Sequence, residues 1–158
     1  MQWIELAGLI VICEGAGMIG GRWTGPEIPR WYRALAKPSF NPPGWIFAPV
    51  WTTLYLLMAI AAWLVLNSPS SSARTLGLSL FFFQLALNLA WSWIFFRKHA
   101  LGAAAVEVAV LWLTIGATTL VFAQVSSVAA WLMAPYWAWV TFASILNATI
   151  WRLNPSAG

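Results

Sequence analysis

Charged and chemically reactive side chains are scarce in this sequence. Lys, Arg, Asp and Glu together make up 8% of its 158 residues, whereas an ordinary soluble domain is roughly 25% charged. Aspartate is absent, and histidine and cysteine occur once each, as His99 and Cys13. These absences exclude a Ser-His-Asp triad, a disulfide framework, a zinc site and bis-histidine haem ligation. We therefore expect no metal site and no ordinary acid, base or nucleophile catalysis, so binding is the more economical function.

Apolar residues dominate what is present. They make up 61% of the chain, and the mean hydropathy is +0.77. Five apolar runs approach the roughly 20 residues that cross the hydrocarbon core of a bilayer, where only a helix satisfies its own backbone within one segment. We predict an all-α membrane protein, a single domain over residues 1–158 built as a bundle of five transmembrane helices. The expected spans are residues 4–21, 45–66, 76–96, 101–122 and 128–153.

One long connector, residues 22–44, joins the first two spans. Its prolines interrupt any long helix, although a short helix is expected near residues 31–36. They are Pro26, Pro29, Pro38, Pro42 and Pro43. The other connectors are short, which predicts that successive helices are antiparallel neighbours.

The basic residues predict how the chain is oriented. The net charge is +4, but the eight Lys and Arg residues are spread between apolar runs, so no nucleic-acid surface is expected. Arg74 alone lies on one side of the predicted spans. The other side carries Arg22, Arg30, Arg33, Lys37, Arg97, Lys98 and Arg152. By the positive-inside rule, the long loop and the C-terminus face the cytoplasm and the N-terminus faces outside.

Tryptophan is unusually frequent, with 13 residues. Trp3, Trp45 and Trp151 lie near predicted span ends, where an aromatic belt accounts for them. A belt does not account for the deeper ones, which are Trp51, Trp91, Trp93, Trp112 and Trp139. These either fill helix–helix contacts or form the walls of a binding pocket.

Helical spacing places several of the deep aromatic residues on shared faces with amides. The aligned sets are Phe47, Trp51, Tyr55 and Met58; Gln84, Asn88 and Trp91; and Trp139, Ala143, Leu146 and Asn147. An amide at this depth is costly unless it meets a partner or a cavity, so Gln84, Asn88 and Asn147 should face the bundle interior. Two interpretations remain open: hydrogen bonds between helices, or a pocket for a flat, mostly apolar ligand.

Two carboxyl groups also fall within predicted spans, Glu14 in the first and Glu107 in the fourth. Ionisable groups at such depth are functional candidates. Glu107 could instead pair with the basic turn at Arg97 and Lys98. The sequence offers no reason to pair the two carboxyl groups with each other.

The long loop and the segment after it carry a specific pattern. The pattern comprises Trp31, Tyr32, Leu35, Lys37, Pro38, Phe40, Pro42, Pro43, Trp45, Phe47, Pro49, Trp51, Leu54, Tyr55 and Met58. It continues with Gln84, Asn88, Trp91, Phe95 and Phe96, then with Pro135, Tyr136, Trp139, Leu146, Asn147, Trp151 and Arg152. Together these blocks resemble the tryptophan-rich sensory protein family, also called the translocator or peripheral-type benzodiazepine receptor family. The three blocks occur in the family's order and span nearly the whole chain.

The resemblance implies a bacterial member with five transmembrane helices, commonly a homodimer, and a ligand cavity closed by the long loop. It implies binding of protoporphyrin IX, haem or another flat apolar ligand, with no obligatory cofactor, and a role in tetrapyrrole homeostasis or stress responses. Carried over by motif, the ligand-binding residues are Trp31, Tyr32, Phe47, Ala48, Trp51, Asn88, Trp91, Trp139, Ala143 and Leu146. Some members are described as promoting light-dependent porphyrin breakdown, which would involve Trp51 and Trp139.

The chain departs from relatives at three positions. Ala148 stands where the sterol pattern of animal members needs a tyrosine, which weakens the expectation of sterol binding. Ala103 stands where they have a tryptophan, and we expect this to widen the cavity wall. Phe40 replaces a common tryptophan.

Three functions follow as hypotheses. The leading one is a membrane receptor or carrier for a tetrapyrrole that stacks on Trp51 and Trp139 while Asn88 orients a polar edge. In this hypothesis Arg30, Arg33 and Lys37 could meet porphyrin propionates, and Tyr32 is the one loop oxygen that could ligate haem iron. The second is an enzyme that degrades porphyrin in light. The third is a structural or regulatory membrane subunit whose cavity holds lipid or sterol, with Gly17, Gly21 and residues 102–105 available for close helix contacts.

Overall fold

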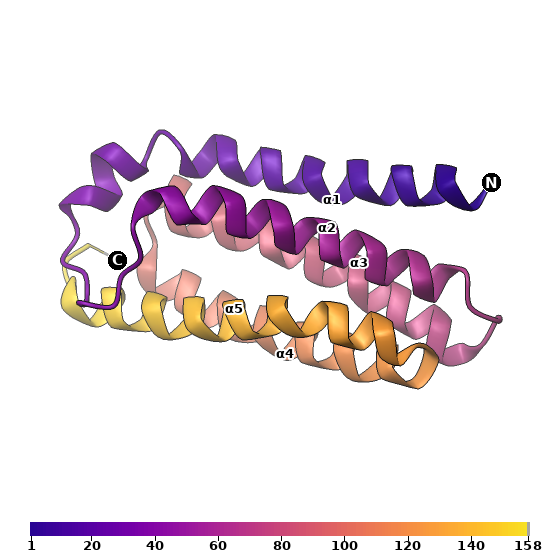
Figure 1. Ribbon diagram of the computed structural model, residues 1–158. Helices are drawn as coiled ribbons and strands as arrows, with labels where there is room; N and C mark the ends of the chain where they lie inside the picture. Colours follow the sequence, from indigo (N-terminus) through magenta and orange to yellow (C-terminus); the bar gives the residue numbers. More distant parts are fainter. Residues whose placement is uncertain (158) are drawn as a thin grey trace.

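A computed structural model describes residues 1–157 as an all-helical bundle, and this part of the chain contains no strand. Five helices are long and apolar enough to cross a membrane, as the sequence predicts. They are α1 (Gln2–Thr24), α2 (Phe47–Leu66), α3 (Ser72–Ser92), α4 (Leu101–Val125) and α5 (Ser127–Leu153). Figure 1 shows them side by side, with the N-terminus at one end and the C-terminus at the other.

Helix ends differ from the expected spans by up to four residues. α1 runs to Thr24, because Arg22 and Trp23 continue the helix beyond the apolar run. A π-helical turn, Trp93–Arg97, extends α3. In the long connector the helical turn is Ile28–Tyr32, a π-turn that begins earlier than the expected 31–36. A short turn at Gly44–Ile46 leads directly into α2.

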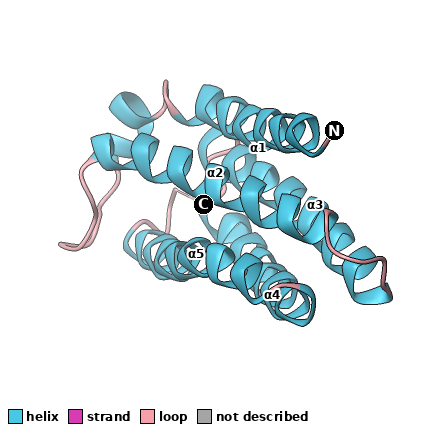
Figure 2. Ribbon diagram, turned by 45° about the vertical axis from the view of Figure 1, so that its right-hand side comes forward, coloured by secondary structure: helices cyan, strands magenta, loops and turns pink. Residues whose placement is uncertain are grey.

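The five helices do not pack equally. α4 packs on α3 and α5, and α2 packs on α5, whereas α1 packs chiefly on α2 with lesser contacts to α3. The rotated view separates α1 from the α4–α5 pair (Figure 2). Because lipid is as apolar as a side chain, such contacts depend on close packing rather than on hydrophobic burial.

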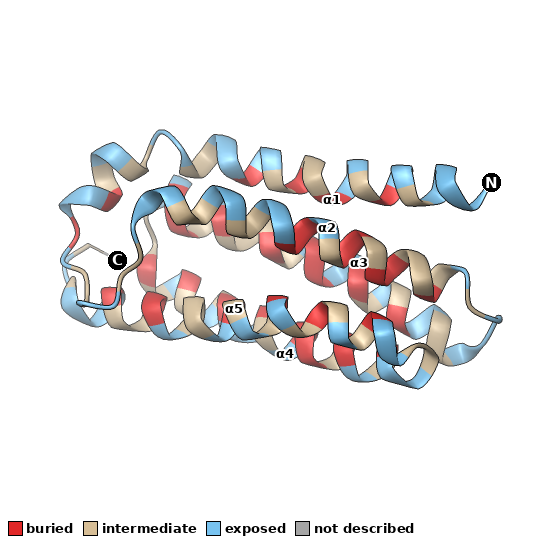
Figure 3. Cartoon of the chain, in the orientation of Figure 1, coloured by how far each residue is buried: buried red, intermediate tan, exposed pale blue. Residues whose placement is uncertain are grey.

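The end of the bundle away from the long connector is densely packed. We call it the packed half, made of residues 58–65 of α2, 77–85 of α3, 111–122 of α4 and 129–138 of α5. Met58, Phe81 and Phe122 are fully buried there, and Figure 3 colours stretches of α2 and α3 in this part of the bundle red for buried. The ring of Trp137 packs directly against Gly116. A Cβ at this position would lie only 2.6 Å from that ring, so a larger residue would not fit. The helices of this half are therefore closely packed.

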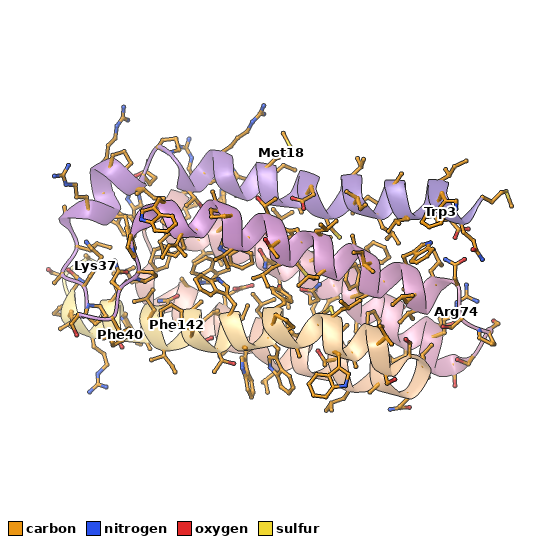
Figure 4. All side chains as sticks on the ribbon, viewed as in Figure 1. Trp3, Met18, Lys37, Phe40, Arg74 and Phe142 are labelled. Atoms are coloured by element: carbon orange, nitrogen blue, oxygen red, sulfur yellow. The ribbon has the colours of Figure 1, made fainter. Side chains whose placement is uncertain are left out.

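Side chains tie α1 to α2 at the same end. Trp63 Nε1 donates to the Gln2 carbonyl oxygen at 2.9 Å, and the Trp63 ring stacks on Trp3 at 5.6 Å. Asn67 donates to a carboxylate oxygen of Glu5 at 3.1 Å. Trp3 also remains largely exposed and is labelled near the N-terminus in Figure 4. Its exposure at the span end fits an aromatic belt.

A buried hydrogen-bond network crosses the middle of the bundle. Tyr55 donates its hydroxyl to Asn88 Oδ1, Asn88 Nδ2 donates to the Tyr136 hydroxyl, and Tyr136 donates to Gln84 Oε1, each at 2.8 Å. The chain of bonds joins α2, α3 and α5. The prediction that Gln84 and Asn88 face the interior is confirmed. These amides act as hydrogen-bonding links between helices, which satisfies them at a depth without water.

Glu107 does not form the expected pair with Arg97 and Lys98. Both of its carboxyl oxygens are buried and have no hydrogen-bond partner among the described residues. Arg97 and Lys98 are exposed at the turn beyond α3, and Lys98 lies over the ring of Trp93 instead, 4.8 Å from its centroid. The prediction of a local ion pair is wrong because the turn directs its cations outward.

Candidate ligand cavity

A cavity of about 340 Å³ occupies the other half of the bundle. We call this the cavity half, made of residues 14–25 of α1, 44–55 of α2, 88–96 of α3 and its extension, and 139–150 of α5. Its volume lies at the lower end of the range for small-molecule sites. The lining is mostly apolar and aromatic. Tyr55 and Asn88 of the buried network form its inner boundary with the packed half.

The structure brings nine of the ten predicted site residues around this single cavity. They come from four separate segments, which the sequence could not assemble. They are Tyr32, Phe47, Ala48, Trp51, Asn88, Trp91, Trp139, Ala143 and Leu146. Their role in binding a ligand stays a prediction.

Trp31 is the exception. Its ring stacks on His99, with centroids 4.1 Å apart and planes 13° apart, and its edge meets Phe95. It is not among the cavity-lining residues. Trp31 thus packs against His99 instead of lining the cavity, and its role in binding a ligand stays a prediction.

Aromatic side chains form much of the wall. Trp51 lies 5.6 Å from Tyr55 and 6.2 Å from Tyr136, ring centroid to ring centroid. On α5, Trp139 packs against Phe47 of α2 at 6.3 Å and against Phe142 at 5.4 Å. The two indoles thus come from different helices, and each is held by neighbouring rings.

Sequence reasoning missed several lining residues, among them Ser92, Phe95 and Phe142. Phe142 follows Trp139 by one helical turn, so spacing could have found it. Glu14, a functional candidate in the sequence because it is ionisable within a span, also lines the cavity. Ser92 carried no signal in the sequence, because it lines the cavity where α1 approaches α3: a Cβ on Gly20 would lie 3.3 Å from the Ser92 hydroxyl oxygen.

A segment that we call the lid, residues 25–43, contributes Gly25, Ile28 and Tyr32 to the cavity lining. It lies at the end of the bundle where the C-terminus lies (Figure 1). Asn154 at the end of α5 bonds both backbone groups of Ala36: the Ala36 N–H donates to Oδ1 at 3.0 Å, and Nδ2 donates to the carbonyl at 2.8 Å. His99 contacts the Glu27 carboxylate at 3.0 Å. The lid is therefore fastened to the α3–α4 turn and to the C-terminal end of α5.

Lys37 and Tyr32 serve the lid's own structure. The Lys37 ammonium donates to the carbonyl oxygens of Tyr32, Arg33 and Leu35 at 2.8, 3.2 and 2.7 Å, so it is engaged rather than free for a propionate. The Tyr32 hydroxyl donates to Asn41 Oδ1 at 2.6 Å. Burial raises the pKa of Tyr32 to about 12, so the hydroxyl remains a protonated donor to Asn41 at neutral pH.

Two other expectations change. Ala103 is exposed on the outer face of α4 and lines no part of the cavity, so a tryptophan there would not narrow the site in this chain.

Gly17 does not offer its surface to a second copy, because the ring of Tyr55 lies against it and would be 2.7 Å from a Cβ. Phe40 of the lid packs edge-on against Phe142 at 6.2 Å, and Figure 4 labels both near the lid end of α5.

The comparisons with known proteins agree with this architecture. The model of the TspO/MBR family matches residues 9–152. The chain belongs to the TspO/MBR family. It is 43% identical over 155 residues to the tryptophan-rich protein TspO of Chlorobaculum tepidum, covering 98% of each chain.

More distant relatives in the family match over similar lengths. The translocator protein of Homo sapiens is 38% identical, over 96% of this chain and 91% of its own. The tryptophan-rich sensory protein of Cereibacter sphaeroides is 36% identical, over 98% and 94%. With its five apolar helices, the chain is an integral, multi-pass membrane protein of this family.

Proposed function

We propose that this chain is a membrane receptor or carrier that binds protoporphyrin IX, haem or related flat apolar ligands and so takes part in tetrapyrrole homeostasis or stress responses. The observation that carries the proposal is the convergence of Trp51 and Trp139, from α2 and α5, on one lid-covered cavity. Aromatic rings give flat ligands both contact area and favourable stacking geometry.

The size of the cavity supports a particular way of binding. About 340 Å³ is small for a complete macrocycle, so part of the tetrapyrrole extends towards the lid. Arg30 and Arg33 are exposed there and form no ion pair among the described residues. They are the partners we assign to the propionates, and Lys37 is withdrawn from that role.

The test is a titration with protoporphyrin IX in neutral detergent, followed by porphyrin fluorescence anisotropy. Trp51→Ala with Trp139→Ala should weaken binding at least about tenfold, because two stacking contacts are lost. The matched control is Trp93→Ala with Trp131→Ala, two exposed indoles outside the cavity, which should leave the affinity unchanged. Equal affinities in both double variants would refute the proposal.

A second candidate function, light-dependent breakdown of bound porphyrin, is supported by the ring neighbours of Trp51. Tyr55 and Tyr136 lie close enough to the Trp51 indole to donate an electron to it after it has been oxidised. Illumination of the porphyrin complex in air should then give several product molecules per protein, and Trp51→Phe should lower that number. Bleaching of one porphyrin or less per protein would identify a binder that is merely damaged.

We also propose that the lid and the C-terminus face the cytoplasm. Both lie at the bundle end opposite the N-terminus (Figure 1), and seven of the eight basic residues flank it, in line with the positive-inside rule. Cys13 is buried, so cysteines introduced at Ser39 in the lid and Ser70 in the opposite loop can be labelled selectively. A membrane-impermeant maleimide applied to intact cells should label Ser70→Cys alone, and labelling of Ser39→Cys alone would reverse the orientation. The homodimer implied by the family resemblance stays a prediction.

A further inference from the structure

The amides of the cavity wall are already committed to other protein groups. Asn88 accepts from Tyr55 and donates to Tyr136. Asn147 accepts from Trp91 Nε1 at 3.0 Å and donates to the Leu101 carbonyl at 3.1 Å. A ligand therefore finds these groups largely satisfied, and its polar contacts depend on other side chains.

Glu14 is the acidic side chain of the cavity wall. It lies on α1, and it is the α1 lining residue farthest from the lid. It forms no ion pair with any described residue, and the hydrogen bonds of the wall join other groups. Within residues 1–157 no Lys, Arg or His lines the cavity. The inner end of the cavity thus holds a carboxyl group without a protein cation.

The rings around this carboxyl group favour the same kind of ligand. Tyr55 borders the cavity beside α1, its ring lying against Gly17 one turn from Glu14, and Trp51 packs on Tyr55. The faces of aromatic rings attract cations, most strongly where water is excluded. A ligand anion placed beside Glu14 would instead be repelled by a like charge, whereas a cationic nitrogen would be attracted to it.

We infer that Glu14 makes this cavity selective for flat apolar ligands with a positively charged, N–H-donating nitrogen, over neutral or anionic ligands of the same shape. The inference rests on the proposed function, since it names a ligand class for the same cavity. It also predicts how a tetrapyrrole with propionate groups is oriented in the cavity. Glu14 repels the propionates from the inner end, so they remain at the lid near Arg30 and Arg33.

Three tricyclic probes of nearly equal size test the inference: an aminoacridine, cationic at neutral pH; anthracene, neutral; and anthracene carboxylate, anionic. Dissociation constants are measured by fluorescence in neutral detergent, with protoporphyrin IX as competitor. The wild type should bind the cation at least about tenfold more tightly than the anion, which corresponds to one charge-assisted hydrogen bond. Glu14→Gln should reduce this ratio about tenfold and leave the affinity for anthracene within about twofold.

Two further variants separate charge from packing. Glu14→Asp keeps the charge and should retain most of the preference for the cation. Glu5→Gln removes a carboxylate from the same helix outside the cavity and should change nothing. The inference is overturned if Glu14→Gln leaves the ratio of the affinities for the cation and the anion unchanged. It is also overturned if this variant weakens the binding of all three probes equally. The proposed function is tested separately by the double variant Trp51→Ala with Trp139→Ala. If that variant binds protoporphyrin more weakly than the wild type, the proposed function stands even when the inference about Glu14 fails. If its affinity for protoporphyrin is unchanged, the proposed function is refuted.

Discussion

The packed half and the cavity half are built from the same helices, yet they use aromatic residues in opposite ways. In the packed half, Phe81 stacks on Phe122 at 6.0 Å and both are fully buried. In the cavity half, Trp51 and Trp139 keep part of their surface free beside an open volume. The difference shows that the spacing of the helices decides the role of a hydrophobic ring. Where helices pack closely the rings fill the contact between them, and where α1 stands apart from α5 the rings line a cavity.

The Tyr55–Asn88–Tyr136–Gln84 network separates the two halves. Its bonds fix α2, α3 and α5 relative to one another at the depth where the cavity begins. The cavity lies on one side of this layer and the packed half lies on the other. The following changes would break or sharpen the contrast, in order of decreasing expected effect.

Phe81→Ala should be the most damaging. It removes a fully buried ring from the packed half and should lower the free energy of unfolding by about 3 kcal/mol. The matched control is Phe82→Ala, the adjacent residue, whose ring is 44% exposed towards lipid. Denaturant titration in detergent, followed by circular dichroism, measures both. Equal losses would mean that burial of the Phe81 ring does not stabilise the packed half.

Gly17→Ala should come next, because the new Cβ would lie 2.7 Å from the Tyr55 ring. That ring cannot swing away, since its hydroxyl is bonded to Asn88, so α1 must move outward at a cost of about 1–3 kcal/mol. Gly15→Ala is the control, with nothing within 4 Å of its Cβ. Thermal unfolding should separate the two variants, and identical melting curves would contradict the close approach of α1.

Tyr136→Phe should cost about 1–2 kcal/mol. It deletes the hydroxyl that accepts from Asn88 and donates to Gln84, leaving both amides short of a partner. Because the network is the inner boundary of the cavity, the affinity for protoporphyrin should fall as well. Leu85→Met, a volume-conserving change in the same buried layer, is the control and should leave binding unchanged.

Asn154→Ala should cost about 1 kcal/mol or less, since its two bonds to Ala36 are exposed. Its main effect should be on the lid: trypsin should cleave faster at Arg33, and a bound porphyrin should dissociate faster. Asn67→Ala removes similar bonds at the opposite end of the bundle and should leave both rates alone. Equal acceleration by the two variants would argue against a local latch.

Alkaline pH should affect the lid only above pH 10.0, so near neutrality it has the smallest effect of all. Tyr32 has a pKa raised from 10.0 to about 12, so its contribution to stability is fully present below pH 10.0 and is lost as the pH rises towards about 12. Its ionisation ends the donation to Asn41. Phenolate absorbance of the wild type minus that of Tyr32→Phe reports the titration, and a midpoint near pH 10 would show that the lid does not bury this ring.

Much of the fold and part of the site could be predicted from the sequence. Hydropathy fixes the number of helices, because a backbone in hydrocarbon has almost no alternative to a helix. Helical spacing identifies faces, such as the one that carries Gln84, Asn88 and Trp91, because the 3.6-residue period is a local property. The cost of burying an amide then requires that such a face point inward.

The tertiary structure decided which of those inward groups meet, and what remains between them. Spacing cannot say that Asn88 bonds Tyr55 and Tyr136 rather than a ligand, that Trp31 stacks on His99 outside the cavity, or that Glu14 lines the cavity while Glu107 is buried without a partner. These outcomes depend on how far apart the helices stand and how each is rotated. That arrangement comes from the packing of all five helices together, whereas each helix by itself follows from its own residues.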